Sequence, residues 1–312
     1  MHPAFSVIFF TTASGAGYGL LALTGIAVPF GLLPADRGFG LVTLALGLGL
    51  VTAGLLSSSA HLGRPERAWR AFSQWRTSWL SREGVLSVGT YVPAVIFAYA
   101  WIFLGRLSVV AGLATALLAA VTVYCTAMIY ASLKPIHAWR NTWVPRVYLI
   151  LALMSGALWL NALVQLWGGG ATWLTVLVTL SIALAVWMKE RYWTFIDTTY
   201  SPASPESATG LGDRGSVSFL DGPHTEANYL LREMGYRIAR KHSLKLRRIA
   251  LALGFALPLL LTLLSALLSG TTAAFAALLA AVSAMIGILV ERWLFFAEAK
   301  HTVTLYYGAT TA

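Results

Sequence analysis

Eight long stretches without a charged side chain constrain this chain of 312 residues more than any other feature of its sequence. One helical crossing of a bilayer needs about 20 consecutive, mostly apolar residues. The stretches have about that length, except the sixth, which Tyr192 and Trp193 extend as interfacial anchors. They cover residues 6–33, 39–59, 85–104, 109–132, 147–167, 173–188, 249–269 and 273–290. The chain is therefore predicted to be an all-α integral membrane protein with eight transmembrane helices.

The composition agrees with this prediction and excludes a water-soluble domain. Only 11% of the residues are charged, whereas a soluble domain carries roughly 25%. Hydrophobic residues make up 58% of the chain, and the mean hydropathy is +0.72. Lipid must therefore solvate most of the surface. A transmembrane β-barrel would show short segments of alternating hydrophobicity, and these are absent.

The links between the apolar stretches predict how the helices are arranged. Brief turns at residues 34–38, 105–109, 168–172 and 270–272 join the helices into four hairpins. The whole of 1–312 is thus predicted to be a single polytopic domain, with one sizeable extramembrane segment at 189–248. Proline and glycine predict a loop in the first half of that segment, and helical spacing predicts a helix over 225–248. The segment is expected either to dock a partner subunit or to lie on lipid headgroups.

The basic residues predict an orientation. With eight spans, 20 of the 22 lysines and arginines fall on one side of the membrane. Only Arg37 and Arg106 fall on the other. Because cytoplasmic loops are enriched in Lys and Arg, both termini and the long segment are expected to face the cytoplasm.

Several kinds of chemistry are disfavoured. A transmembrane haem needs two axial ligands on facing helices, but all six histidines lie in loops or at span ends. The single cysteine, Cys125, cannot by itself build a Cys-ligated metal site. Neither haem nor metal is therefore expected in this chain. Transporters usually carry ionisable groups near the bilayer midplane, and the middles of these spans have none. Nothing in the sequence indicates nucleic-acid binding.

Ionisable residues do gather at the membrane boundary on the basic side. His61 ends the second stretch, Glu83 precedes the third, and Glu291 follows the eighth. The hairpin arrangement places His61 and Glu83 at similar depth on neighbouring helix ends. An acidic residue there can simply favour the first turn of a helix, and a boundary histidine can be an ordinary hydrogen-bonded residue. The residues alone leave these interpretations open.

Motifs around these residues make the interpretation more specific. The chain has HLGRP at 61–65 and SWLSRE at 78–83. It opens with MHPAFSVIFFTT at 1–12 and SGAGYG at 14–19, and it has AMIYASL at 127–133. In these motifs the sequence resembles the membrane anchor subunit of the dimethyl sulfoxide reductase family. The resemblance covers essentially the whole chain.

The resemblance implies a haem-free, quinone-reactive anchor in a bacterial cytoplasmic membrane. Such an anchor holds a four-cluster iron–sulfur subunit, which is connected to a molybdopterin catalytic subunit, so the substrate chemistry belongs to a partner chain. The family's quinol-binding histidine and glutamate match His61 and Glu83. A histidine and a partly buried glutamate suit the proton transfers of quinone chemistry. Together with Arg64, Trp79 and Arg82 they form the predicted quinone site.

One feature distinguishes two branches of the family. The motifs PESATG at 205–210 and NYLLREMG at 228–235, with the cytoplasmic orientation, resemble the anchors of cytoplasm-facing sulfite dehydrogenases. We therefore expect electrons to pass from sulfite oxidation to ubiquinone or menaquinone. A menaquinol-oxidising anchor of a dimethyl sulfoxide reductase is the alternative. A purely structural anchor and a small-solute transporter are the remaining hypotheses.

Overall fold

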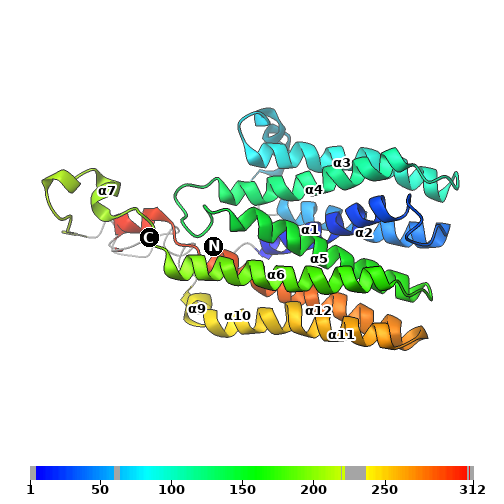
Figure 1. Cartoon of the computed structure of the whole chain (residues 1–312). Helices are drawn as coiled ribbons and strands as arrows, with labels where there is room; N and C mark the ends of the chain where they lie inside the picture. Colours follow the sequence, from blue (N-terminus) through cyan, green and yellow to red (C-terminus); the bar gives the residue numbers. More distant parts are fainter. Residues whose placement is uncertain (1–4, 60–63, 219, 222–236, 308, 310–312) are drawn as a thin grey trace.

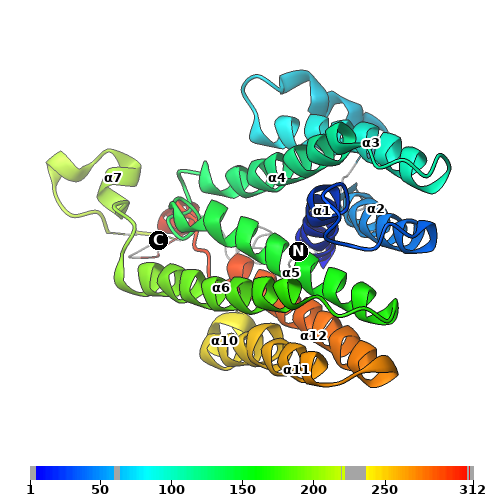
Figure 2. The ribbon, with the colours of Figure 1, turned by 45° about the vertical axis from the view of Figure 1, so that its right-hand side comes forward.

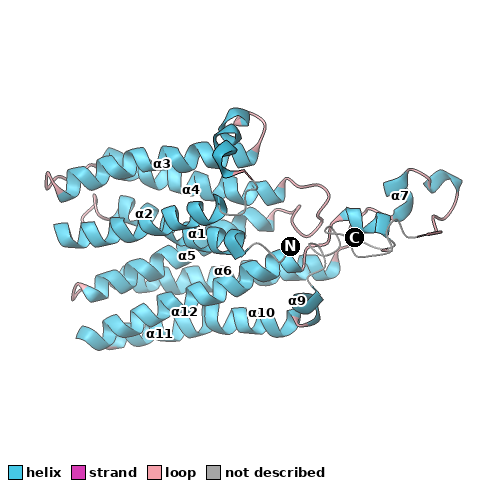
Figure 3. Cartoon of the chain, turned by 180° about the vertical axis from the view of Figure 1, so that it is seen from behind, coloured by secondary structure: helices cyan, strands magenta, loops and turns pink. Residues whose placement is uncertain are grey.

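The computed structural model describes residues 5–59, 64–218, 220–221, 237–307 and 309, and it contains no strand in these ranges (Figures 1 and 3). Within the described ranges, eight helical segments are long and apolar enough to cross a membrane, which confirms the predicted all-helical, eight-span architecture. The first six are α1 Phe5–Ala27, α2 Arg37–Ser59, α3 Trp79–Ile102, α4 Val109–Ala131, α5 Trp143–Leu166 and α6 Thr172–Thr198. The seventh runs through α10 Ser243–Leu251, the π-helical η3 Ala252–Ala256 and α11 Leu257–Leu267; the eighth is α12 Gly270–Ala297.

The helix ends differ from the predicted ones for two physical reasons. Counting apolar residues ends a span at the first charge, but the helices continue through charged residues at the basic side. Thus α3 starts at Trp79, where the Ser78 hydroxyl accepts a hydrogen bond from the Ser81 amide. In contrast, α1 ends at Ala27 rather than 33, because the residue before Pro29 is biased away from helical geometry.

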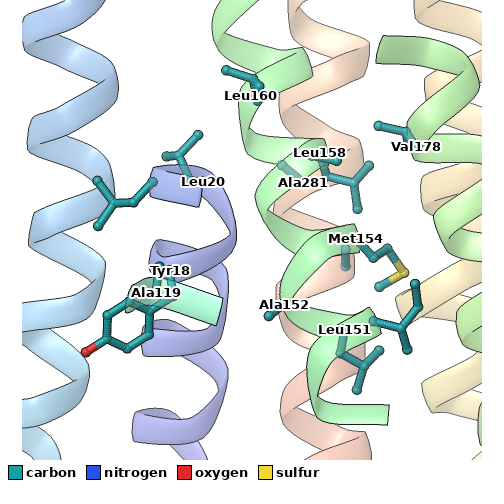
Figure 4. Packing of buried hydrophobic residues seen from close by; sticks show 14 of the residues in the cluster. Tyr18, Leu20, Ala119, Leu151, Ala152, Met154, Leu158, Leu160, Val178 and Ala281 are labelled. Atoms are coloured by element: carbon teal, nitrogen blue, oxygen red, sulfur yellow. The ribbon is translucent and has the colours of Figure 1, made fainter. Parts of the chain in front are cut away.

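Helices α1 and α5 form the centre of the bundle. Helix α1 packs against α2, α4, α5 and α12, and the α3–α4 pair lies at the opposite edge from α10–α12 (Figure 2). Small residues allow close contact where α1 crosses α5, because a Cβ on Gly19 would overlap the backbone of Ala152. Tyr18 and Leu20 of α1, with Met154 and Leu158 of α5, belong to the buried core (Figure 4).

Shorter elements gather at the basic end of the bundle (Figure 1). They are η1 Pro65–Gln74, α7 Pro205–Thr209, η2 Gly212–Arg214, α9 Arg237–Lys241 and η4 Thr302–Tyr307. Helix α7 lies in a stretch predicted to be a loop, and a capping box between Ser204 and Ser207 starts it. Of the helix predicted over 225–248, residues 225–236 lie outside the described residues. The described remainder is divided at His242 into α9 and α10.

Candidate functional site

Glu83 is a buried carboxylate near the basic-side end of α3. The residue is only 5% exposed. The Thr126 hydroxyl of α4 donates a hydrogen bond to Glu83 Oε1 at 2.9 Å. Because α3 starts at Trp79, Glu83 lies within the helix and points toward the protein interior rather than into a loop.

A pocket of about 490 Å³, here called the boundary pocket, opens beside Glu83 between the end of α2, η1 and α3. Apolar residues such as Leu55, Phe72 and Leu80 form much of its wall. Arg64 and Arg67 also line it. The pocket therefore combines an apolar wall with one buried carboxylate and two arginines, where α2 ends and α3 begins.

Gly84 contributes to the shape of the boundary pocket. A Cβ at this position would lie 3.1 Å from the Phe72 ring, which is closer than a comfortable van der Waals contact. Phe72 of η1 can therefore rest against α3 because residue 84 has no side chain.

The structure brings only some of the predicted site residues into this pocket. Glu83 and Arg64 line it, whereas Trp79 and Arg82 do not. His61 lies outside the described residues, three positions before Arg64.

Arg82 and Trp79 instead hold the turn between η1 and α3. Arg82 donates hydrogen bonds to the carbonyls of Trp75, at 3.0 Å, and Arg76, at 2.7 Å. Its guanidinium lies 4.3 Å from the centroid of the Trp79 ring. Trp79 also packs edge-on against Tyr124 of α4. Both side chains thus fix the position of η1 relative to the pocket.

Sequence reasoning missed four residues of this region. Arg67 and Phe72 belong to the link between α2 and α3, in which aromatic residues are interleaved with arginines. Ser87 lines the pocket one turn beyond Glu83. Thr126 contacts Glu83 from α4, the other helix of the same hairpin, and no local pattern predicts which residues of the two helices meet.

A second polar cluster, here called the buried ion triad, consists of Lys189, Glu291 and Arg292. All three side chains are buried. Lys189 Nζ contacts Glu291 Oε1, and Arg292 Nε donates to Glu291 Oε2. The extramembrane segment is predicted to begin at residue 189, and in the structure α6 continues to Thr198 with Lys189 packed inside the bundle.

Aromatic rings surround the two cations of the triad. Lys189 Nζ lies 4.2 Å from the centroid of Tyr192, and the Arg292 guanidinium lies 4.1 Å from that of Tyr148. With two cations and one carboxylate, the triad has a formal excess of one positive charge. Such charges are costly to bury unless they are paired.

A third polar group ties α6, α10 and the end of α12 together at the basic end. Arg247 bonds to both oxygens of Asp197, at 2.6 and 2.9 Å, and to Glu298 Oε1 at 2.7 Å. Burial raises the pKa of Glu298 although Arg247 opposes this effect. Burial also lowers the pKa of nearby His137, whose Nε2 contacts the Thr199 hydroxyl at 2.9 Å.

No group of three or more His, Cys, Asp or Glu side chains that could hold a metal ion occurs among the described residues. The side chains that line the boundary pocket offer acid–base and hydrogen-bonding chemistry.

Comparison with known proteins gives two matches. The family model for the DMSO reductase anchor subunit (DmsC) matches residues 1–309. The chain is also 34% identical to a sulfite dehydrogenase subunit of Allochromatium vinosum, over 98% of this chain and 99% of that protein. The chain therefore belongs to the DMSO reductase anchor subunit family, as the motifs predicted. It is a multi-pass membrane anchor of a molybdoenzyme complex, with catalytic and iron–sulfur subunits as partners.

Proposed function

We propose that this DMSO reductase-family anchor carries out the quinone reaction of its complex, with the quinone headgroup in the boundary pocket. Electrons from sulfite oxidation in a molybdopterin subunit reach the pocket through a four-cluster iron–sulfur subunit. The similarity to a sulfite dehydrogenase subunit supports this direction. A menaquinol-oxidising anchor, with electrons flowing the other way to a reductase, is the alternative.

The observation that carries the proposal is the combination of Glu83, Arg64 and Arg67 around one apolar pocket. Binding sites for small amphipathic ligands are mostly apolar, with a few polar groups that fix orientation. The apolar wall suits an isoprenoid tail and ring, and the polar groups suit the oxygens of the headgroup. The pocket lies at the boundary, where lipid, water and a docked iron–sulfur subunit are all close.

The side chains provide the proton chemistry that this reaction requires. Interconversion of quinone and quinol moves two electrons and two protons. Glu83 exchanges a proton with a headgroup oxygen, while Arg64 and Arg67 offset negative charge nearby. His61 is proposed as the second headgroup contact on the strength of its family motif. Trp79 and Arg82 support the site by holding η1 against α3.

The proposed location is the bacterial cytoplasmic membrane, with both termini, η1 and the partner subunits on the cytoplasmic side. The support is the positive-inside asymmetry of the loops. A topology reporter fused after Ala312 should be active only if the C-terminus is cytoplasmic. A periplasmic signal there would reverse the orientation and favour the reductase alternative.

The direct test replaces Glu83 by glutamine in the complete complex. Glu83→Gln keeps the shape of the side chain but removes the ionisable proton carrier. Because acid–base assistance contributes about 10²–10⁴-fold, quinone-coupled turnover should fall by a factor in that range. The rate is normalised to the rate with a soluble artificial acceptor in the same preparation. The matched control is Glu190→Gln, an exposed carboxylate of α6 at the same end of the bundle.

A near-normal quinone-coupled rate in Glu83→Gln, with the complex still on the membrane, would contradict the proposal. It would favour a purely structural anchor.

A further inference from the structure

A small cavity, here called the internal cavity, lies between α1, α4, α5 and α12, and all of its lining residues except Gly15 are buried. Its volume is about 20 Å³, which is enough for a single water molecule. Thr126, Tyr148 and Arg292 all line it. The cavity therefore touches both the hydrogen-bond partner of Glu83 and a member of the buried ion triad.

Buried donors at this cavity lack acceptors within the described part of the chain. Arg292 is only 2% exposed, and its Nε is bonded to Glu291. Its two terminal nitrogens, Nη1 and Nη2, make no well-formed hydrogen bond there. The Tyr148 hydroxyl lies beside this guanidinium and interacts with it, but one hydroxyl leaves most of the N–H groups of Arg292 without an acceptor. An unpaired buried donor is costly, and buried waters typically bond to such groups. The geometry thus calls for a water in the cavity.

The Thr126 hydroxyl joins this cavity to Glu83. Two acceptors lie within its reach, Glu83 Oε1 at 2.9 Å and the Thr122 carbonyl at 3.1 Å. A hydroxyl has only one proton to donate. When it donates to Glu83, its oxygen remains available to accept a hydrogen bond from the cavity.

We propose that one water molecule in the internal cavity connects Arg292 to Thr126 and thereby positions the carboxylate of Glu83. Arg292 donates to the water, the water donates to Thr126, and Thr126 donates to Glu83. In this series of hydrogen bonds every donor points the same way. The series starts on Arg292, a fixed cation, and ends on Glu83, an anion. Hydrogen bonds aligned in this manner strengthen one another. The role assigned to Arg292 and Thr126 rests on the proposed quinone function of Glu83.

The same geometry accommodates the protonated form of Glu83. A protonated carboxyl group donates its own hydrogen to Thr126 Oγ1, and the Thr126 proton then turns to the Thr122 carbonyl. Neither state leaves a donor of Glu83 or Thr126 without an acceptor. Glu83 can therefore gain a proton from the headgroup, or return it, without disrupting the interior.

The test compares variants of the complete membrane-bound complex. Thr126→Val removes the hydroxyl at nearly constant shape, and Thr126→Ser retains it. Arg292→Met removes the cation at the cavity but leaves Lys189 and Glu291 as a balanced pair. Its matched control is Lys189→Met, which makes the same change in the charge of the triad and keeps Arg292 in place.

We expect Thr126→Val and Arg292→Met each to lower the kcat of quinone-coupled turnover on the order of tenfold, the scale of losing a hydrogen bond to a charged group. Rates are normalised to a soluble acceptor. The KM for quinone should stay the same, because neither residue lines the boundary pocket. Thr126→Ser should restore the rate, and Lys189→Met should not reproduce the loss.

The outcomes separate this inference from the function on which it rests. If Glu83→Gln lowers the quinone-coupled rate but Thr126→Val does not, the inference fails and the proposed function stands. Equal losses in Arg292→Met and Lys189→Met would also overturn it, since the triad would then act only as a structural unit. If the complex that carries Arg292→Met does not assemble, the test rests on Thr126→Val and Thr126→Ser. Equal quinone-coupled rates in these two variants would then overturn the inference.

Discussion

The boundary pocket and the buried ion triad contain the same kinds of residue in opposite situations. In the triad, Glu291 is enclosed by two cations, and all three side chains are buried in the bundle. In the boundary pocket, Glu83 has a neutral partner, Thr126, and lies beside about 490 Å³ of open volume. A carboxylate held between two buried cations is suited to hold helices together. A carboxylate with one neutral partner beside a pocket is suited to exchange a proton.

The difference between the two carboxylates should show most strongly in the stability of the protein. Glu291→Gln leaves two buried cations without a carboxylate and should lower the free energy of unfolding by about 3–5 kcal/mol. Glu83→Gln should cost less than about 1 kcal/mol, because its amide oxygen still accepts from Thr126. Unfolding titrations of the detergent-solubilised chain measure both. Equal losses of unfolding free energy in Glu291→Gln and Glu83→Gln would contradict the distinction between the buried ion triad and the boundary pocket.

The second prediction concerns the shape of the boundary pocket and has a smaller effect. Gly84→Ala places a methyl group 3.1 Å from the Phe72 ring, so the ring must shift within the pocket. The KM for quinone should rise about two- to tenfold, the scale of a lost apolar contact of roughly 1 kcal/mol.

Gly89→Ala is the control for that prediction. It lies on the same helix, α3, and a Cβ there meets no atom within 4 Å. Both substitutions gain the same helix propensity, so the comparison isolates the contact with Phe72. A similar KM in the two variants would show that Phe72 does not shape the quinone site.

The features of the fold that depend on local composition could be predicted from the sequence. Apolar stretches predicted the eight spans, because a bilayer imposes length and polarity on each crossing helix. The motifs placed Glu83 and Arg64 in one site, and the structure brings both to one pocket.

What the sequence did not predict depends on contacts between distant helices. Lys189 was assigned to an extramembrane segment because a charge ends an apolar stretch. Its carboxylate partner, Glu291, is about 100 positions further along the chain. The bond from Thr126 to Glu83 likewise joins two different helices. Only tertiary packing reveals which charges are paired.

The most direct measurement of the central claim is a structure of the membrane-bound complex with a quinone-site inhibitor. We expect the headgroup in the boundary pocket, within hydrogen-bond distance of Glu83, with the tail leaving between α2 and α3 toward lipid. An inhibitor bound instead near the buried ion triad, or in a partner subunit away from η1 and α3, would contradict the central claim.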